Sequence, residues 1–180
     1  KGIPFLPFYS AVEFQSDTPD NVKGRLEEAL IDMGILDALI IPEKYFDQIS
    51  NDDIESADKI IHPNPQFFRQ DLTTYLKPAM PEESSITYED VENVLKSIFL
   101  DDKDSETAIN ENGEYVIGII KGNTSGIYIP KYIGAEARKR YRSEMIQNIQ
   151  TQIVEIKLQI EVENDKIKEI QQSKVVLDTE

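Results

Sequence analysis

The sequence contains no cysteine and no tryptophan, and His62 is its only histidine. Without cysteine the chain can form neither a disulfide nor a thiolate metal site, and this composition is compatible with a reducing compartment. A lone histidine gives no histidine-based metal cluster. Because Pro63 and Pro65 follow it closely, we interpret His62 as a structural or surface residue rather than as part of a Ser-His-Asp triad.

Long apolar runs are also missing. No stretch approaches the roughly 18 apolar residues that a membrane-spanning helix needs, and no signal-peptide pattern opens the sequence. We therefore expect a cytoplasmic protein without a membrane partner. The chain begins at Lys1 and is still helix-forming at Leu177, so we expect it to be a region of a longer protein.

Positive charge is scarce, with 19 Lys and Arg against 34 Asp and Glu and a net charge of -15 at pH 7. The imbalance lies in residues 1–130, which hold 10 basic and 25 acidic residues, whereas residues 131–180 hold nine of each. A surface this acidic repels the phosphate backbone of nucleic acids. We interpret the negative charge as solubilising and expect most of this surface to be a poor platform for nucleic acid.

Two amphipathic helices are predicted in the acidic part. The apolar face of the first consists of Val22, Leu26, Ala29, Leu30 and Met33. Thr18 is its predicted N-cap, and Gly34 lies just beyond its end. The apolar face of the second consists of Val91, Val94, Leu95 and Ile98. Thr87 and Asp90 form a pair typical of a capping box at its start.

Short strands are predicted around these helices, at residues 8–14, 36–41, 115–120 and 127–129. Asn112 and Gly113 predict a hairpin turn before the third of them. Gly118 inside that strand suggests the close approach of another backbone. Residues 43–84 are interrupted by prolines and are interpreted as loops with short helices packed on the core.

The last part of the chain has a different character, because no proline or glycine occurs from Ala135 onward. Apolar residues there recur at alternating spacings of three and four, and only Glu163 and Lys174 interrupt the series. This pattern predicts one seam of a left-handed coiled coil over nearly five heptads. The apolar seam residues are Ile146, Ile149, Ile153, Ile156, Ile160, Ile167, Ile170 and Leu177.

These patterns predict an α+β fold: a compact globule with a small mixed or antiparallel sheet and packed helices, followed by a long coiled-coil helix. The predicted boundary separates a globule of residues 1–133 from a coiled-coil part of residues 134–180. A helix with such a seam needs a partner helix.

The candidate chemical motifs are weak. The acidic run 101–106 lacks the glycine and the spaced glutamate of an EF-hand loop, so we interpret it as a solvated loop. The glycines between Gly118 and Gly126 are not followed by Lys and Ser or Thr, as a phosphate-binding loop would be. Glu27 and Glu28 are interpreted as a solvated helix face. We expect no catalytic residue, no metal and no cofactor in this chain, and neither binding nor hydrolysis of ATP.

A basic cluster lies at the start of the predicted long helix and consists of Lys131, Arg138, Lys139, Arg140 and Arg142. The helix dipole disfavours cations at this end, so a compensating partner is expected. One interpretation is pairing with the acidic globule of this chain or of a second copy. The other is contact with DNA phosphates at the junction between globule and coil.

Several segments together resemble the hinge-bearing central region of one family, the JetC family of large SMC-like (MukB/SbcC-like) ATPases in bacterial Wadjet plasmid-defence systems. The segments that carry the resemblance are Pro7-Phe8-Tyr9, Val12-Glu13-Phe14, Leu26-Glu27-Glu28-Ala29-Leu30, Gly34-Ile35-Leu36-Asp37-Ala38-Leu39, Gly113-Glu114-Tyr115-Val116-Ile117-Gly118 and Tyr132-Ile133-Gly134-Ala135-Glu136-Ala137-Arg138, closing on Arg142.

The resemblance implies a hinge at the midpoint of a longer chain whose two ends carry the ATPase heads. Such complexes act on plasmid DNA, which a separate nuclease subunit cleaves. It further implies a homodimer formed through the globule, and antiparallel pairing of the long helix with an upstream arm of the same parent chain. The alternative is a non-catalytic module that binds protein or DNA, with the coiled coil as a spacer and only weak DNA contact.

Overall fold

The computed structural model describes residues 2–49, 59–102 and 104–177, the last three by their backbone alone. Residues 1–138 form one compact unit, the globule, and residues 139–180 form a second. The predicted boundary lies five residues earlier, at Ile133. The difference arises because the side chain of Arg138 is hydrogen-bonded within the globule.

Helix α2, Asp20–Asp32, buries the predicted apolar face. It ends as expected, because Gly34 adopts a positive φ of 69° directly after the C-cap. Thr18 was predicted to cap the start, and this is wrong. The N-cap is Pro19, and the Thr18 hydroxyl instead donates to the carbonyl of Tyr75, 3.3 Å away.

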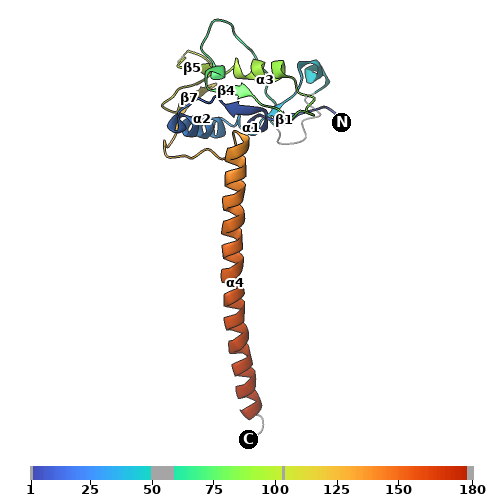
Figure 1. Cartoon of the computed structure of the whole chain (residues 1–180), viewed down its shortest axis with the longest axis vertical. Helices are drawn as coiled ribbons and strands as arrows, with labels where there is room; N and C mark the ends of the chain where they lie inside the picture. Colours follow the sequence, from blue (N-terminus) through green and yellow to red (C-terminus); the bar gives the residue numbers. More distant parts are fainter. Residues whose placement is uncertain (1, 50–58, 103, 178–180) are drawn as a thin grey trace. The chain divides into compact units, whose positions relative to one another are not determined.

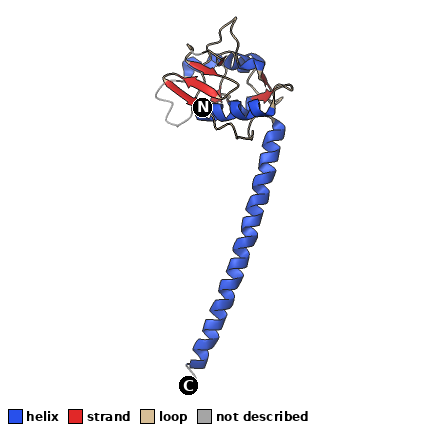
Figure 2. Cartoon of the chain, turned by 90° about the vertical axis from the view of Figure 1, so that its left-hand side faces the viewer, coloured by secondary structure: helices blue, strands red, loops and turns tan. Residues whose placement is uncertain are grey.

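Helix α3, Tyr88–Leu95, confirms its start signal fully. The Thr87 hydroxyl accepts from the Asp90 backbone N–H, and the Asp90 carboxylate accepts from the Thr87 backbone N–H. Val91, Val94 and Leu95 are buried. Figures 1 and 2 show the strands of the globule between α2 and α3.

Short strands pair into three small sheets. β1 (Leu6–Pro7) pairs antiparallel with β3 (Leu39–Ile40), and β2 (Val12–Phe14) pairs antiparallel with β4 (Leu76–Pro78). The third sheet has the order β5-β6-β7-β8, in which β5 and β6 are parallel and the other pairs antiparallel. Its strands are β5 (Phe99–Leu100), β6 (Thr107–Ile109), β7 (Glu114–Ile117) and β8 (Ile120–Asn123).

The parallel pair β5-β6 is joined by residues 101–106 alone. Parallel strands ordinarily need a crossover connection of about a dozen residues or more. Asp101 begins this short connection with a positive φ of 53°, and its backbone N–H donates to the carbonyl of Ile109. The acidic run is therefore a tight connection within the sheet.

The predicted strand at residues 8–14 is wrong in its first half. Phe8–Ala11 forms a single helical turn, α1, and only Val12–Phe14 is extended. Phe8 and Ala11 are both fully buried. Their spacing of three places them on one face of a helical turn, which competes with the period-two pattern seen in the sequence.

Three more strand predictions need correction. Of residues 36–41, only Leu39–Ile40 is a strand, β3. Residues 115–120 do not form one strand, because β7 ends at Ile117 and Gly118, with a φ of 55°, turns the chain into β8. The backbone of Glu106 does approach Gly118, as expected, because the Gly118 N–H donates to the Glu106 carbonyl at 2.6 Å. A Cβ at Gly118 would nevertheless meet no described atom within 4 Å, so it is the positive φ of the turn that favours glycine here. Residues 127–129 form no strand. The hairpin turn at Gly113 is confirmed, with a φ of 85°.

Residues 43–84 contain short elements, as expected, among the residues described there. They include the 3-10 helices η1 (Glu43–Gln48) and η3 (Leu72–Thr74), and also β4, which the sequence pattern missed. Leu72 and Leu76 from this stretch are fully buried in the core. Residues 50–58 lie outside the described part.

Helix α4, Ala135–Leu177, is a single uninterrupted helix (Figure 2). Its residues from Lys139 onward belong to the second unit. The absence of proline and glycine explains its length, because no residue within it breaks the hydrogen-bond ladder. The α+β fold class with small sheets and a long C-terminal helix is thereby confirmed.

Candidate functional site

A buried carboxylate holds the segment that leads into α4. Glu27 lies on α2 and its side chain has no solvent exposure. One oxygen, Oε1, accepts from the Tyr128 hydroxyl at 3.0 Å and from the backbone N–H of Lys131 and Tyr132 at 2.6 and 3.0 Å. The other, Oε2, accepts from the backbone N–H of Ile133 at 2.8 Å. A buried carboxylate is stable only when it is satisfied in this way.

Residues 124–133, here called the strap, cross α2 at a glycine. A Cβ atom placed on Gly24 would lie 2.2 Å from the carbonyl oxygen of Tyr128. Real atoms do not approach so closely, so the crossing requires glycine in the middle of the helix. Glu28 adds a hydrogen bond to the backbone N–H of Ser125 at 3.1 Å. One face of α2 therefore fixes the strap along most of its length.

Glu27 corrects an interpretation made from the sequence, where it was assigned to a solvated helix face. Two signals could have identified it. Gly24 is unusual inside a helix, and Glu27 follows it by three residues, so the two share one face. A glycine followed by an acid at this spacing indicates a backbone that crosses the helix and is held by the acid.

Arg138 completes the attachment of the strap. Its Nη1 donates to the carbonyl oxygens of Tyr9 and Tyr132, at 3.0 and 2.9 Å. The rings of these two tyrosines pack against each other with centroids 6.3 Å apart. This guanidinium nitrogen is thus committed to the globule, although the sequence placed Arg138 among the candidate DNA contacts.

The basic cluster is divided between the two units. Lys131 and Arg138 belong to the globule, and the Lys131 ammonium lies 5.3 Å from the ring centroid of Tyr128. Lys139, Arg140 and Arg142 belong to α4 and have exposed side chains. Their exposure leaves the predicted DNA contact as an open hypothesis for these three residues.

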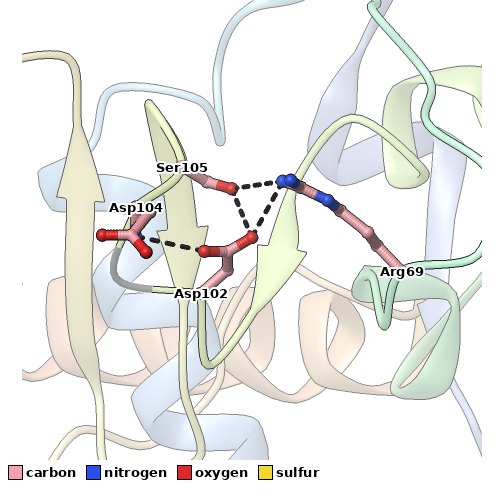
Figure 3. A network of polar contacts seen from close by, with 4 residues as sticks. All are labelled: Arg69, Asp102, Asp104 and Ser105. Carbon is pink, nitrogen blue, oxygen red and sulfur yellow. Dashed lines mark hydrogen bonds and ion pairs between the residues drawn. The ribbon is translucent and has the colours of Figure 1, made fainter.

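The acidic connection 101–106 is organised by a polar network, shown in Figure 3. Arg69 Nη1 donates to Asp102 Oδ2 at 2.8 Å and to the Ser105 hydroxyl oxygen at 2.9 Å. The Ser105 hydroxyl donates to Asp102 Oδ2 at 2.7 Å, and the Asp104 backbone N–H donates to Asp102 Oδ1. The hydrogen bond from Ser105, supported by that from Asp104 and by the Arg69 charge, lowers the pKa of Asp102.

This network gives the acidic run a structural role. Asp102 already receives hydrogen bonds on both oxygens, and they tie the connection to Arg69. Within residues 2–49, 59–102 and 104–177, no group of three or more His, Cys, Asp or Glu side chains could hold a metal ion. The ring of His62 packs against Phe46, with centroids 4.7 Å apart.

The globule contains a polar cavity of about 750 Å³ beside the third sheet. Lys59, His62, Arg69, Ser97 and Glu106 are among its charged and polar lining residues. Arg69 and Ser105 both line this cavity and are hydrogen-bonded to each other in the network of Figure 3. Part of the lining is therefore engaged in structural contacts.

The seam on α4 is uncovered. Its described isoleucines, from Ile146 to Ile170, are between 45% and 68% exposed. The side chain of Leu177, the last predicted seam residue, lies outside the described part. Burying the exposed remainder of an isoleucine contributes about 1 kcal/mol, so covering seven of them amounts to roughly 7 kcal/mol. A helix with this stripe gains substantially from a partner.

A second, shorter apolar stripe lies on α4 and was not recognised in the sequence. Val154, Leu158 and Val162 follow one another at spacings of four, and each is more than half exposed. At 100° per residue they lie on the side of the helix opposite the seam. They provide a comparison face of similar exposure and chemistry.

No protein-family model, curated protein or solved structure matches this chain. The described residues contain no helix that combines the length and the apolar character needed to cross a membrane.

Proposed function

We propose that this chain is a non-catalytic dimerisation module at the root of a coiled-coil arm, of the hinge type found in SMC-like ATPases that act on plasmid DNA in bacterial defence. The observation that carries the proposal is α4, whose 43 residues present an exposed seam directly after an α+β globule. At 1.5 Å per residue this helix spans about 65 Å, which is long for a helix that packs on a domain of this size.

The firm attachment of the helix root supports an arm rather than a loose tail. Glu27 fixes the backbone of residues 131–133, and Arg138 in the first turn of α4 binds two carbonyls of the globule. A root held by five charge-assisted hydrogen bonds or more can transmit force between an arm and a hinge. A flexible spacer needs no such anchor.

Dimerisation through the globule is supported by its exposed apolar side chains. These are Phe5, Phe67, Phe68, Ile119, Ile127 and Ile129, each at least 60% exposed. Residue Phe68 also has a positive φ of 70°, an uncommon conformation for a bulky side chain. Exposed aromatic residues of this kind are enriched in the centres of protein interfaces.

A DNA-binding module on a coiled-coil spacer is the second candidate. The exposed side chains of Lys139, Arg140 and Arg142 favour it. The net charge of -15 on residues 1–130 opposes it, because the acidic surface repels the same phosphates that these residues would contact. Dimerisation is therefore the preferred function, and any DNA contact is proposed to be weak.

The test is the mass of the chain in solution, measured by size-exclusion chromatography with light scattering. The seam variant combines Ile153→Lys, Ile156→Lys and Ile160→Lys. Its matched control combines Val154→Lys, Leu158→Lys and Val162→Lys, which adds the same charge on the opposite face. A dimer through the globule persists in both variants. A seam variant that is monomeric at high concentration refutes the hinge proposal.

A further inference from the structure

The seam of α4 carries two charged residues at positions that a partner helix covers. Glu163 and Lys174 continue the heptad series between and beyond the isoleucines, seven residues after Ile156 and Ile167 respectively. In the structure the Glu163 carboxylate pairs with Lys166 of the same helix at 2.8 Å, and both side chains are exposed. An exposed pair three residues apart contributes only a few tenths of a kcal/mol.

A covering helix would change the environment of the Glu163 carboxylate from water to a partly dehydrated interface. There, one contact from Lys166 does not satisfy its two oxygens. A charged residue in a coiled-coil seam costs stability unless the partner offers a complementary group, and it sets both the register and the choice of partner. The identity of the partner can therefore be argued from Glu163.

A second copy of α4 is a poor partner in either orientation. In a parallel, in-register pair, Glu163 faces Glu163 of the copy and Lys174 faces Lys174. In an antiparallel pair, the register that places Lys174 opposite Glu163 brings no residue of α4 opposite the seam from Ile146 to Ile156. Registers that cover this part place Glu163 against isoleucine, with no opposite charge to meet it.

The residues flanking the seam also give a second copy no attraction. The two flanks, from Met145 to Ser173, consist almost entirely of glutamine, asparagine and other neutral residues. Their only charged members are Lys157 and Lys166. Flanking charges select coiled-coil partners, and two copies of this helix bring lysines to neutral residues or to lysines, never to an acid.

We propose that the helix covering the seam is not a second copy of α4 but a different amphipathic helix. That helix is apolar at its own seam positions, carries Lys or Arg at the position facing Glu163, and carries Asp or Glu along the flanks facing Lys157 and Lys166. The inference rests on the proposed coiled-coil arm and defines the chemistry of its partner. It does not depend on dimerisation of the globule.

Two fluorescent synthetic helices test the proposal on the full chain. Each has about four heptads, an Ile and Leu seam and Glu flanks, and they differ only in a single seam residue, Lys or Glu, at the position facing Glu163. Binding is measured by anisotropy. We expect the Lys peptide to bind at least 30-fold more tightly than the Glu peptide, a difference of about 2 kcal/mol.

A charge reversal provides the control. Glu163→Lys should reverse the preference, so that the Glu peptide binds more tightly. Asp165→Lys makes the same change of charge two residues away, outside the seam, and removes a similar ion pair, that of Asp165 with Lys168 at 3.0 Å. We expect it to leave the preference for the Lys peptide unchanged.

The proposal is overturned if neither peptide binds, if the wild-type chain binds both within threefold, or if Asp165→Lys reverses the preference as Glu163→Lys does. It is also overturned if the chain associates through α4 itself, so that the seam variant has a lower mass than the opposite-face control. A seam variant and a wild-type chain that are both monomeric refute dimerisation of the globule, while the peptide preference still decides the chemistry of the partner.

Discussion

Removing the buried carboxylate of Glu27 should destabilise the globule in a graded way. Glu27→Ala leaves three backbone N–H groups and the Tyr128 hydroxyl without their acceptor. Each unsatisfied buried donor costs about 1–3 kcal/mol, and losing the desolvation penalty of the carboxylate offsets part of the sum. We expect a loss of about 3 kcal/mol in the free energy of unfolding, a large share of the 5–15 kcal/mol typical of a domain.

Glu27→Gln should cost less, about 1–2 kcal/mol, because the amide keeps one oxygen. That oxygen can replace Oε1, which accepts three of the four hydrogen bonds. The amide nitrogen then faces the backbone N–H of Ile133, which has lost its acceptor. The order Ala, Gln, wild type in increasing stability is a specific consequence of this geometry.

Urea unfolding followed by near-ultraviolet circular dichroism of the tyrosines measures these changes, since the chain has eight tyrosines and no tryptophan. Hydrogen exchange should become faster for the Lys131, Tyr132 and Ile133 amides in Glu27→Ala, and chiefly for the Ile133 amide in Glu27→Gln. Glu28→Gln is the matched control, because this neighbour accepts a hydrogen bond from the Ser125 backbone N–H at the surface rather than in the core. If Glu27→Gln and Glu28→Gln unfold at the same urea concentration and the three amides keep their protection, the carboxylate does not hold the strap.

Three further predictions concern other parts of the chain. Gly24→Ala should lower the free energy of unfolding by about 1–2 kcal/mol, because the clash with the Tyr128 carbonyl outweighs the gain of up to 1 kcal/mol in helix propensity. Urea unfolding measures this change, and a variant more stable than wild type would contradict the close crossing of the strap over α2. Burial, together with the hydrogen bond and charge of Glu111, raises the pKa of Tyr75 to about 12. The neutral phenol is favoured in the folded state, so its stabilising contribution is present below pH 10 and is lost as the pH rises towards 12. In an alkaline titration of tyrosine absorbance, Tyr75→Phe should remove the ionisation with the highest pKa. If it instead removes an ionisation near pH 10, the contact between Tyr75 and Glu111 does not raise the pKa. DNA binding by the chain should be weak, with a log–log salt slope of about -3 for the three exposed basic residues Lys139, Arg140 and Arg142. Tight binding that survives replacement of these three residues by alanine would exclude them as the contact.

Local signals predicted those elements whose ends are defined by side-chain chemistry. The Thr87–Asp90 capping box, Gly34 after α2 and Gly113 in the hairpin each act within a few residues, and each is present as expected. The apolar face of α2 was also predictable, because helical periodicity needs only the segment itself.

The errors fall where a distant segment decides the local structure. Residues 127–129 look like a strand in sequence, but the strap is held by α2 through the hydroxyl of Tyr128, about a hundred positions away in the chain, and not by a sheet. Glu27 was misassigned for a related reason, since its four donors come from the strap, 101 to 106 positions away, and the nearby Gly24 indicates a crossing backbone without identifying it. Helix α1 was missed because Phe8 also continues the alternation of Val12 and Phe14, which hid the helical spacing of three between Phe8 and Ala11.

The hydrogen bonds of Glu27 also set an order of events during folding. The strands β5 to β8 pair with their neighbours in the chain, so the third sheet closes through short loops and can form early. The contacts between Glu27 and the strap span 101 to 106 positions, and the hydrogen bond from Arg138 to Tyr9 spans 129, so closing them costs more loop entropy than closing the sheet. During synthesis the Glu27 carboxylate therefore stays hydrated until residues 128–133 have emerged, and the segment that leads into α4 is the last part of the globule to become fixed.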